Sequence, residues 1–364
     1  MWTYHNPVNI VFANGALENI GGLLKGRGYA LVTYDEPLFR ALSERIQAAA
    51  GQAQVVIDNV TQNPDFHMLS ESCRMFGVAK DDIGVIVAVG GGSVIDAAKV
   101  LAASDGNFDV VKDFLETGEG GEKISPVPII AVPTTSGTGS EVTCWATVWD
   151  TDAQKKYSLN LPALYPEHAV VDTELMLGAP RGLTVSTGLD ALSHALESIW
   201  NVNANPVSSA LAVSAASDVL ETLPALADDL DNLDLRSRMA RAAMIAGLAF
   251  SNTKTALAHS VSYPITLKHG VPHGIACSFS LAMVMRWVTG NDTGCDASLK
   301  RIFGPDLTAG AEKLEAFLQG LGIGTLPEDH GVQPAEWKAL VEEALVGERG
   351  RNFLGDPDSV LGGL

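Results

Sequence analysis

The apolar positions in the first half of the chain alternate between short continuous runs and stretches with helical spacing. Four runs rich in Val, Ile and Ala predict buried strands at residues 30–34, 54–57, 84–89 and 128–132. Between them, apolar residues recur every three or four positions, which predicts helices at 37–50, 65–76 and 94–103. Strands that alternate with helices in this way are typical of a parallel sheet covered by helices.

The strand signal largely disappears after Gly178, and helical spacing takes over. The helical patterns lie at 207–223, 235–261 and 309–321. We therefore predict an α/β domain at residues 1–178 and an all-α domain at residues 179–364, with the boundary at a Gly-Ala-Pro sequence.

The composition is typical of a soluble globular protein. Of 364 residues, 46% are hydrophobic, and we expect no membrane span because no apolar run comes near the about twenty residues that one needs. The net charge of −19 would repel a phosphate backbone, so we expect neither a nucleic-acid nor a membrane partner. An anionic substrate would need its own basic residues for the same reason.

We expect a cytoplasmic protein with reduced thiols. The N-terminal residues contain no basic segment followed by an apolar run, which an export signal would require. Cys144 has no evident base partner, so we interpret it as a small buried residue. The four cysteines are Cys73, Cys144, Cys277 and Cys295, and their spacing fits neither a disulfide framework nor a zinc knuckle.

Asp190 and His194 form the first half of a candidate metal site. On a helix, residues four apart share one face, so a carboxylate oxygen and an imidazole nitrogen can converge there. A simple surface pair is the alternative interpretation. The apolar residues around the pair and two later histidines favour the metal site.

His259 and His273 would supply the second half of this site. On one continuous helix they would lie roughly 21 Å apart, too far to share an ion. We therefore expect the chain to turn between them at Pro264, Gly270 and Pro272. His259 would then end one helix, and His273 would begin the next element.

A candidate phosphate-binding turn follows the strand predicted at 84–89. Gly90, Gly91, Gly92 and Ser93 open directly into a helix, so free backbone N–H groups and the helix dipole could bind a pyrophosphate. The usual GxGxxG pattern is absent, and a simple tight turn is the alternative. Small hydroxyl residues and glycines at 133–141 follow the next strand, where a dinucleotide would lie.

Asp35 closes the first predicted strand and bears on cofactor choice. Its carboxylate could accept hydrogen bonds from ribose hydroxyls and would repel a 2′-phosphate, which favours NAD(H) over NADP(H). An ordinary aspartate that opens a turn is an equally good interpretation of the residue alone.

Three segments resemble the metal-binding motifs of the iron-containing alcohol dehydrogenase family: residues 188–197, residues 249–252 with His259, and the Pro-His-Gly sequence at 272–274. The resemblance covers nearly the whole chain. It implies the dehydroquinate synthase-like fold, with an α/β nicotinamide-cofactor-binding domain, a helical metal-binding and substrate domain, and a homodimer. The site residues that it implies are Asp190, His194, His259 and His273 for the metal, and Gly90 to Ser93, Thr134, Thr135 and Ser140 for the cofactor.

The chemistry that this resemblance implies is hydride transfer between NAD(P)H and an aldehyde or alcohol carbon beside a divalent metal. One carboxylate and three imidazoles suit Fe²⁺ or Zn²⁺ equally, so iron is the family's implication. Many members carry a second histidine four residues after the one at position 259, where this chain has Tyr263. A phenol is a poorer proton shuttle at neutral pH, and His269 is an alternative, which leaves the proton route open.

Residues 145–150, 155–159, 197–201 and 203–206 are most similar to the phosphonoacetaldehyde reductases of this family. The similarity implies reduction of phosphonoacetaldehyde to 2-hydroxyethylphosphonate in phosphonate biosynthesis. Such a substrate needs cations near the metal. The candidates are Lys254, Arg351 with Asn352, and Lys155 with Lys156. The alternatives are a general iron-dependent alcohol dehydrogenase, a maleylacetate-type reductase or polyol dehydrogenase, and a nucleotide-binding regulatory protein with a structural metal.

Overall fold

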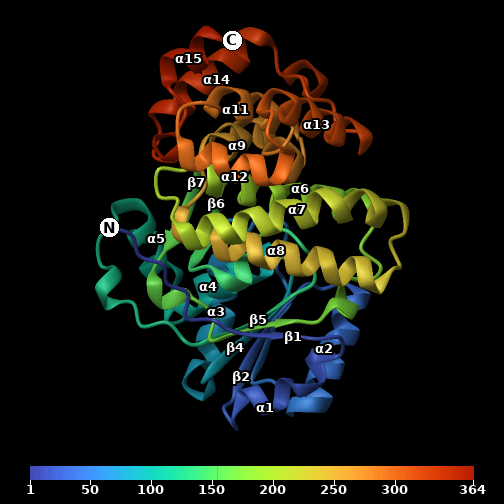
Figure 1. The fold of residues 1–364 in the computed structure, drawn as a ribbon. Helices are drawn as coiled ribbons and strands as arrows, with labels where there is room; N and C mark the ends of the chain where they lie inside the picture. The colour runs from blue at the N-terminus through green and yellow to red at the C-terminus, as the bar shows by residue number, and fades with distance from the viewer. Residues whose placement is uncertain (154) are drawn as a thin grey trace. The chain divides into compact units, whose positions relative to one another are not determined.

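The computed structural model describes residues 1–153 and 155–364, and this part of the chain forms two compact units (Figure 1). One unit, here called the sheet unit, contains Asn6–Thr135 and Ser140–Met176. The other, the helical unit, contains Met1–His5, Ser136–Gly139 and Leu177–Leu364. Short segments from the first half of the chain therefore belong to the helical unit.

The sheet unit is built on a six-stranded sheet in which every neighbouring pair is parallel, with the strand order β1-β8-β5-β4-β2-β3. The predicted α/β class with a parallel sheet is therefore confirmed. The strands are β1 (Asn9–Phe12), β2 (Tyr29–Val32), β3 (Val55–Ile57), β4 (Val85–Gly90), β5 (Ile129–Pro133) and β8 (His168–Val171).

The four strands that the sequence predicted are β2 to β5, and the other strands were missed. β1 and β8 have only four residues each. An antiparallel hairpin of β6 (Trp145–Asp150) and β7 (Lys155–Asn160) forms a separate two-stranded sheet. Neither strand is fully buried, in contrast to β4: three of the six residues of β6 are buried and only one of the six residues of β7.

Helices cover both faces of the parallel sheet because alternate strand residues point to opposite sides. Ile86 and Ala88 of β4 pack in a core with α3 (Phe66–Ala79), α4 (Gly92–Ser104) and α5 (Phe108–Thr117). The neighbouring residues Val85, Val87 and Val89 pack in a second core with α1 (Ile20–Leu24) and α2 (Pro37–Ala50).

The order of the strands fixes where a ligand can bind. The chain places β3 on one side of β2 and then returns to place β4 on the other side. In open α/β sheets, ligands bind outside the carboxyl ends of strands at such a reversal point. The carboxyl ends of β2 and β4 lie there, and Thr33 after β2 donates a hydrogen bond of 2.8 Å to the carbonyl of Val89.

The helical unit is centred on three long helices that pack together, α6 (Arg181–Ile199), α7 (Pro206–Asp228) and α8 (Leu233–Thr253). The predicted helical character of the second half is thus confirmed. The remaining α-helices are α9 (Leu257–His269), α10 (His273–Ala276), α11 (Leu281–Val288), α12 (Thr293–Phe303), α13 (Leu307–Gly320), α14 (Pro334–Val346) and α15 (Pro357–Gly362).

The helix α7 is longer and more apolar than the sequence analysis expected. By length and composition it could cross a membrane, a property that it shares with the buried core helices of many globular proteins. Ala212, Ala216 and Val219 of α7 are fully buried in the core that it forms with α6 and α8. Asn205 begins the helix by accepting hydrogen bonds from the amides of Val207 and Ser208.

The prediction of one helix at 235–261 is wrong, because the structure has two helices there with a break at residues 254–256. Lys254 ends α8 with φ of 66°, a left-handed conformation that no helix interior contains. Its carbonyl accepts a hydrogen bond from the side chain of Asn201. The break is therefore stabilised by a residue far away in the sequence, which helical spacing does not reveal.

The break expected at Pro264 is also misplaced. Pro264 lies inside α9, and its neighbours Val261 and Ile265 are buried in the core on both sides of it. This packing holds the helix together despite the hydrogen bond that a proline removes. His259 consequently lies in the first turn of α9, not at its end, and the chain turns at Gly270, which has φ of 68°.

Candidate metal centre and cofactor turn

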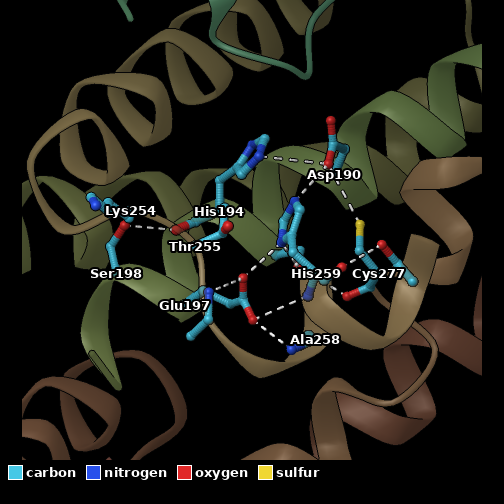
Figure 2. A network of polar contacts seen from close by, with 12 residues as sticks. Asp190, His194, Glu197, Ser198, Lys254, Thr255, Ala258, His259 and Cys277 are labelled. Atoms are coloured by element: carbon cyan, nitrogen blue, oxygen red, sulfur yellow. Dashed lines mark hydrogen bonds and ion pairs between the residues drawn. The ribbon is translucent and has the colours of Figure 1, made fainter. Parts of the chain in front are cut away.

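Asp190 is the point on which three imidazoles converge. Asp190 and His194 lie one turn apart on α6, both buried, with 3.8 Å between Asp190 Oδ1 and His194 Nε2. The same carboxylate oxygen lies 3.4 Å from Nε2 of His259 and 3.9 Å from Nε2 of His273. Figure 2 shows the imidazoles of His194 and His259 directed toward Asp190. The structure thus brings the four predicted metal ligands together from α6, α9 and α10.

Cys277 joins this cluster, which the sequence analysis did not predict. Ligand atoms of Asp190, His259, His273 and Cys277 all lie within 4.8 Å of one another, a group to which His194 does not belong. The thiol donates to Asp190 Oδ1 at 3.5 Å (Figure 2). Burial raises the pKa of Cys277 well above its ordinary value, so the thiol stays protonated in this arrangement. The position of Cys277 four residues after His273 was the feature of the sequence that could have identified it as part of the cluster.

The chemistry of the cluster fits a divalent cation. His259 Nε2 is buried and makes no hydrogen bond within the part of the chain that the structure describes. A buried polar atom without a partner costs about 1–3 kcal/mol, and a metal ion accepts the lone pair of such a nitrogen. Carboxylate and imidazole donors are the ligands that Fe²⁺ and Zn²⁺ prefer.

The cluster contains a buried carboxylate that stays anionic. Burial alone would raise the pKa of Asp190, but the imidazoles of His194, His273 and His259 hold it well below its ordinary value. Burial lowers the pKa of His194 to about 4, although Asp190 opposes the effect. Burial would also lower the pKa of His259, but the carboxylates of Glu197 and Asp190 raise it above the ordinary value. The cluster therefore contains an anionic carboxylate and, in His194, a neutral imidazole.

Glu197 fixes the orientation of His259 and was also missed. Its side chain is fully buried and accepts hydrogen bonds from the backbone amides of Ala256 (2.8 Å) and Ala258 (2.6 Å), at the start of α9. It also lies 2.7 Å from His259 Nδ1 (Figure 2). A carboxylate there selects the tautomer with its proton on Nδ1, which leaves Nε2 as the metal-facing lone pair.

Tyr263 packs against His273, one of the four predicted metal ligands. Its ring stacks on His273 with 5.8 Å between centroids and an angle of 7°. Burial raises the pKa of Tyr263, so the phenol stays neutral and is a poor proton shuttle. On the same ring lies the guanidinium of Arg349, 5.1 Å from the centroid. Arg349 was not evident from the sequence, because its relation to Tyr263 depends on the fold.

The predicted anion-binding residues of the helical unit have other partners or lie exposed. Lys254 Nζ is 3.5 Å from Glu348, and the lysine side chain is 48% exposed. The amide of Asn352 donates a hydrogen bond to the carbonyl of Thr255. Arg351 is exposed. None of these side chains contributes to the cluster of imidazoles.

The other two candidates lie on the hairpin of the sheet unit. The ammonium of Lys155 lies 4.4 Å from the ring centroid of Tyr157, and that of Lys156 lies 5.8 Å from the ring centroid of Trp149. Both lysines therefore pack over aromatic faces of β6 and β7. The structure places them in a different unit from Lys254 and Arg351.

The predicted phosphate-binding turn lies at the carboxyl end of β4. Gly90 is the last residue of the strand, and Gly91 is the N-cap of α4, whose first turn contains Gly92 and Ser93. A side chain at Gly90 would lie 2.5 Å from Val94, so only glycine fits there. The turn leaves the first amides of a thirteen-residue helix free for an anion at the reversal point of the sheet.

Thr134 and Thr135 follow β5, next to this turn. The amide of Thr134 donates a hydrogen bond of 3.0 Å to the carbonyl of Gly90. Thr135 Oγ1 would lie 3.4 Å from a Cβ atom at Gly91, so its hydroxyl borders the same turn. Both predicted cofactor residues thus stand beside the glycines.

Ser140 belongs to a buried polar network. Its hydroxyl donates a hydrogen bond of 2.6 Å to Asp96 and accepts one of 2.8 Å from the ammonium of Lys99. Burial lowers the pKa of Lys99 to about 8, against the opposing charge of Asp96. The structure therefore gives Ser140 a supporting position within the sheet unit, whereas a direct cofactor contact stays a prediction.

Asp35 lies just after β2, as the sequence indicates, but it has a partner. Its carboxylate forms an ion pair of 2.6 Å with Arg40 in α2, and its side chain is 58% exposed. The hydrogen bond and the charge of Arg40 lower the pKa of Asp35. The carboxylate is thus anionic at neutral pH and held at the reversal point of the sheet.

Comparison with known proteins identifies two family models that together span the chain. Residues 7–173 match the model of iron-containing alcohol dehydrogenases, and residues 184–358 match the model of the C-terminal part of the same family. An NAD-dependent methanol dehydrogenase from Bacillus methanolicus is 30% identical, over 95% of this chain and 93% of its own length.

Two further relatives act on aldehydes that carry an anionic group. A phosphonoacetaldehyde reductase from Streptomyces viridochromogenes is 38% identical over 64% of this chain and 59% of its own length. The structure of a sulfoacetaldehyde reductase from Bifidobacterium kashiwanohense, in complex with NAD⁺, aligns with a TM-score of 0.91 and 29% identity, over 100% of this chain and 97% of that chain.

Proposed function

The chain belongs to the iron-containing alcohol dehydrogenase family and is an NAD(P)-dependent alcohol dehydrogenase or aldehyde reductase; on this premise we propose that it reduces phosphonoacetaldehyde to 2-hydroxyethylphosphonate. The observation that carries the reductase chemistry is the convergence of three imidazoles on one buried carboxylate oxygen, Asp190 Oδ1. The phosphonate is supported by the similarity to a phosphonoacetaldehyde reductase.

Asp190, His194, His259 and His273 would hold the divalent cation, with Fe²⁺ favoured over Zn²⁺ by membership of the family. When bound, the cation supplies a Lewis acid that polarises the substrate's carbonyl oxygen. Asp190 contributes the anionic ligand because its pKa is held low. Glu197 holds the ring of His259 in the tautomer that binds a metal.

Gly90 to Ser93, with Thr134 and Thr135, would hold the pyrophosphate of a nicotinamide cofactor, which supplies the hydride. The free amides at the start of α4 and the position at the reversal point of the sheet support this role. Asp35 would favour NAD(H) over NADP(H), since its anionic carboxylate repels a 2′-phosphate.

A small anionic aldehyde is supported by two relatives of this chain. One relative is a phosphonoacetaldehyde reductase and another is a sulfoacetaldehyde reductase. Both substrates place a tetrahedral oxyanion one carbon away from the aldehyde. We place the reaction in phosphonate biosynthesis, in the cytoplasm, and propose that the protein works as a homodimer.

The proposal is tested by a substrate screen with protein reconstituted anaerobically with Fe²⁺ or Zn²⁺. We expect NADH oxidation with phosphonoacetaldehyde at a higher kcat/KM than with propanal, an uncharged aldehyde of similar size. Removal of the metal by a chelator should abolish turnover while circular dichroism shows a retained fold. Preference for propanal would leave a general aldehyde reductase, and turnover that survives metal removal would contradict the proposed site.

A further inference from the structure

We propose that Arg349 binds the anionic group of the substrate and thereby selects aldehydes that carry a phosphonate or a sulfonate. The inference rests on the proposed function and extends it, because it assigns substrate specificity to one residue. It replaces the basic residues that the sequence analysis favoured, Lys254 and Arg351. The shared chemistry of the ligand is a tetrahedral oxyanion next to an aldehyde.

The charge of Arg349 has no anionic partner in the part of the chain that the structure describes. Within the described residues, its guanidinium forms neither an ion pair nor a hydrogen bond, although the side chain is partly buried. No other partly buried or buried arginine in the described chain is in this state, since Arg27 binds Glu167, Arg238 binds Glu221 and Arg236 donates three hydrogen bonds. A partly desolvated cation without a partner is a ready binding site for an anion.

Arg349 lies close to the proposed metal site. Its guanidinium lies 5.1 Å from the ring centroid of Tyr263, and the same ring stacks on His273, a proposed metal ligand, with 5.8 Å between centroids. The guanidinium and the imidazole thus contact the same aromatic ring. A substrate that reaches from the metal to this guanidinium would carry its carbonyl at one end and its anion at the other, as both oxyanion aldehydes do.

The charged residue next to Arg349 is paired with another side chain. Glu348 precedes Arg349 in the sequence, but its carboxylate lies 3.5 Å from the ammonium of Lys254. The lysine and the glutamate thus offset each other, and the charge of Arg349 remains available. In a protein of net charge −19, an uncompensated cation near the site also attracts an anionic substrate.

The chemistry of the guanidinium suits this ligand. Its planar fork donates two parallel hydrogen bonds to two oxygens of a phosphonate or sulfonate, and it remains charged at any physiological pH. Tyr263 supports it as a flat surface, because a neutral phenol ring attracts a cation over its face. Tyr263 would thus position the cation that binds the anionic group of the substrate.

The test compares Arg349→Gln with the matched control Arg351→Gln. Arg351 is two residues away, is exposed, and lies in the short 3-10 helix Gly350–Asn352, of which Arg349 is the N-cap residue. Each holoenzyme is assayed for kcat/KM with phosphonoacetaldehyde, sulfoacetaldehyde and propanal. Loss of a charge-assisted pair predicts roughly a 10- to 100-fold lower kcat/KM for both anionic aldehydes in Arg349→Gln, mainly through KM. Propanal turnover and the Arg351→Gln protein should be unchanged.

Three further measurements separate recognition from a structural role. Calorimetry should show weaker binding of 2-hydroxyethylphosphonate to Arg349→Gln. Arg349→Lys, which keeps the charge without the fork, should lose less activity than Arg349→Gln. Tyr263→Phe should keep the preference for anionic aldehydes because it keeps the aromatic face, whereas Tyr263→Leu should lose part of it.

The outcomes distinguish this inference from the proposed function. If the parent protein prefers anionic aldehydes and Arg349→Gln keeps that preference, the role of Arg349 is refuted and the function stands. An equal loss for propanal in a folded Arg349→Gln protein would also refute it. If the parent favours sulfoacetaldehyde and the variant loses that activity, Arg349 is upheld and the phosphonate assignment fails. A parent without any preference for an anion overturns both.

Discussion

The substitution Glu197→Gln tests whether Glu197 sets the tautomer of His259, because glutamine replaces the carboxylate with a group of the same size. Glutamine has the size of glutamate, and with its carbonyl oxygen in the place of Oε1 it can still accept from the amide of Ala258, whereas the amide of Ala256, which donates to Oε2, loses its acceptor. The amide group of the glutamine, however, can donate to His259 Nδ1, which now lies 2.7 Å from the carboxylate. The proton of the imidazole would then move to Nε2, toward Asp190 Oδ1 at 3.4 Å. A protonated Nε2 is no longer a metal ligand.

The expected magnitude follows from the role of such a partner. Removal of the carboxylate that orients a metal-bound histidine weakens metal binding about 10- to 100-fold, which corresponds to about 1.4–2.7 kcal/mol. The amide of Ala256 loses its acceptor, which costs about 1–3 kcal/mol of folding free energy, whereas the amide of Ala258 keeps the carbonyl oxygen. Metal affinity is therefore compared among variants that remain folded in the metal-free state.

The assay is competition for Zn²⁺ between the protein and a fluorescent chelator. Ser198→Ala is the matched control, because Ser198 is the next residue on α6, is buried, and donates to the carbonyl of His194 without touching His259. Thermal unfolding of the metal-free proteins reports any general damage. Unchanged Zn²⁺ affinity in a folded Glu197→Gln protein would refute the tautomer argument, and equal losses in both variants would make the effect nonspecific.

The remaining predictions concern single groups of the two units. His273→Ala should abolish metal binding and turnover but leave NADH binding intact, because the cofactor turn lies in the sheet unit; a parallel loss of NADH affinity in a fluorescence titration would contradict that division. Asp35→Ser should narrow the preference for NADH, because it removes the carboxylate and frees Arg40 to meet a 2′-phosphate; steady-state kinetics with both cofactors decides, and a parent that already prefers NADPH excludes the role of Asp35. Cys277→Ser should leave the affinity for Co²⁺ unchanged and the parent should show no thiolate-to-metal absorption, because the thiol stays protonated; such an absorption band would make Cys277 a ligand. The pKa of His194 is about 4 in the folded protein, below its ordinary value of about 6.5, so the metal-free protein should lose stability as the pH falls from about 6.5 toward 4. In urea unfolding, His194→Gln should show a smaller loss of stability over the same pH range.

The parts of the fold that the sequence predicted are those with a strong local signal. All six residues of β4 are buried, which produced the continuous apolar run at 84–89. The strands that were missed are short or half-buried, so their runs of apolar residues were not distinctive. The break between α8 and α9 could not be predicted because Asn201 and Glu197, on another part of the chain, stabilise it.

Some residues of the candidate site could likewise be predicted from the sequence, and others could not. Spacing and family resemblance brought Asp190 and His194 to notice, and the structure places them with His259 and His273 around one oxygen. Glu197 and Arg349 act through partners 62 and 86 positions away in the sequence. Contacts of this range are set by tertiary packing, so no local pattern could have identified them.

We propose that one metal ion at Asp190 and its three histidines supports reduction of an anionic aldehyde. This is measured by titrating the metal-free protein with Fe²⁺ under anaerobic conditions and following NADH oxidation by phosphonoacetaldehyde at each addition. We expect a rate that rises in proportion to bound iron and reaches a plateau at about one ion per chain, the number that a single site allows. A full rate in the metal-free protein, or bound iron without any rate with phosphonoacetaldehyde, would contradict it.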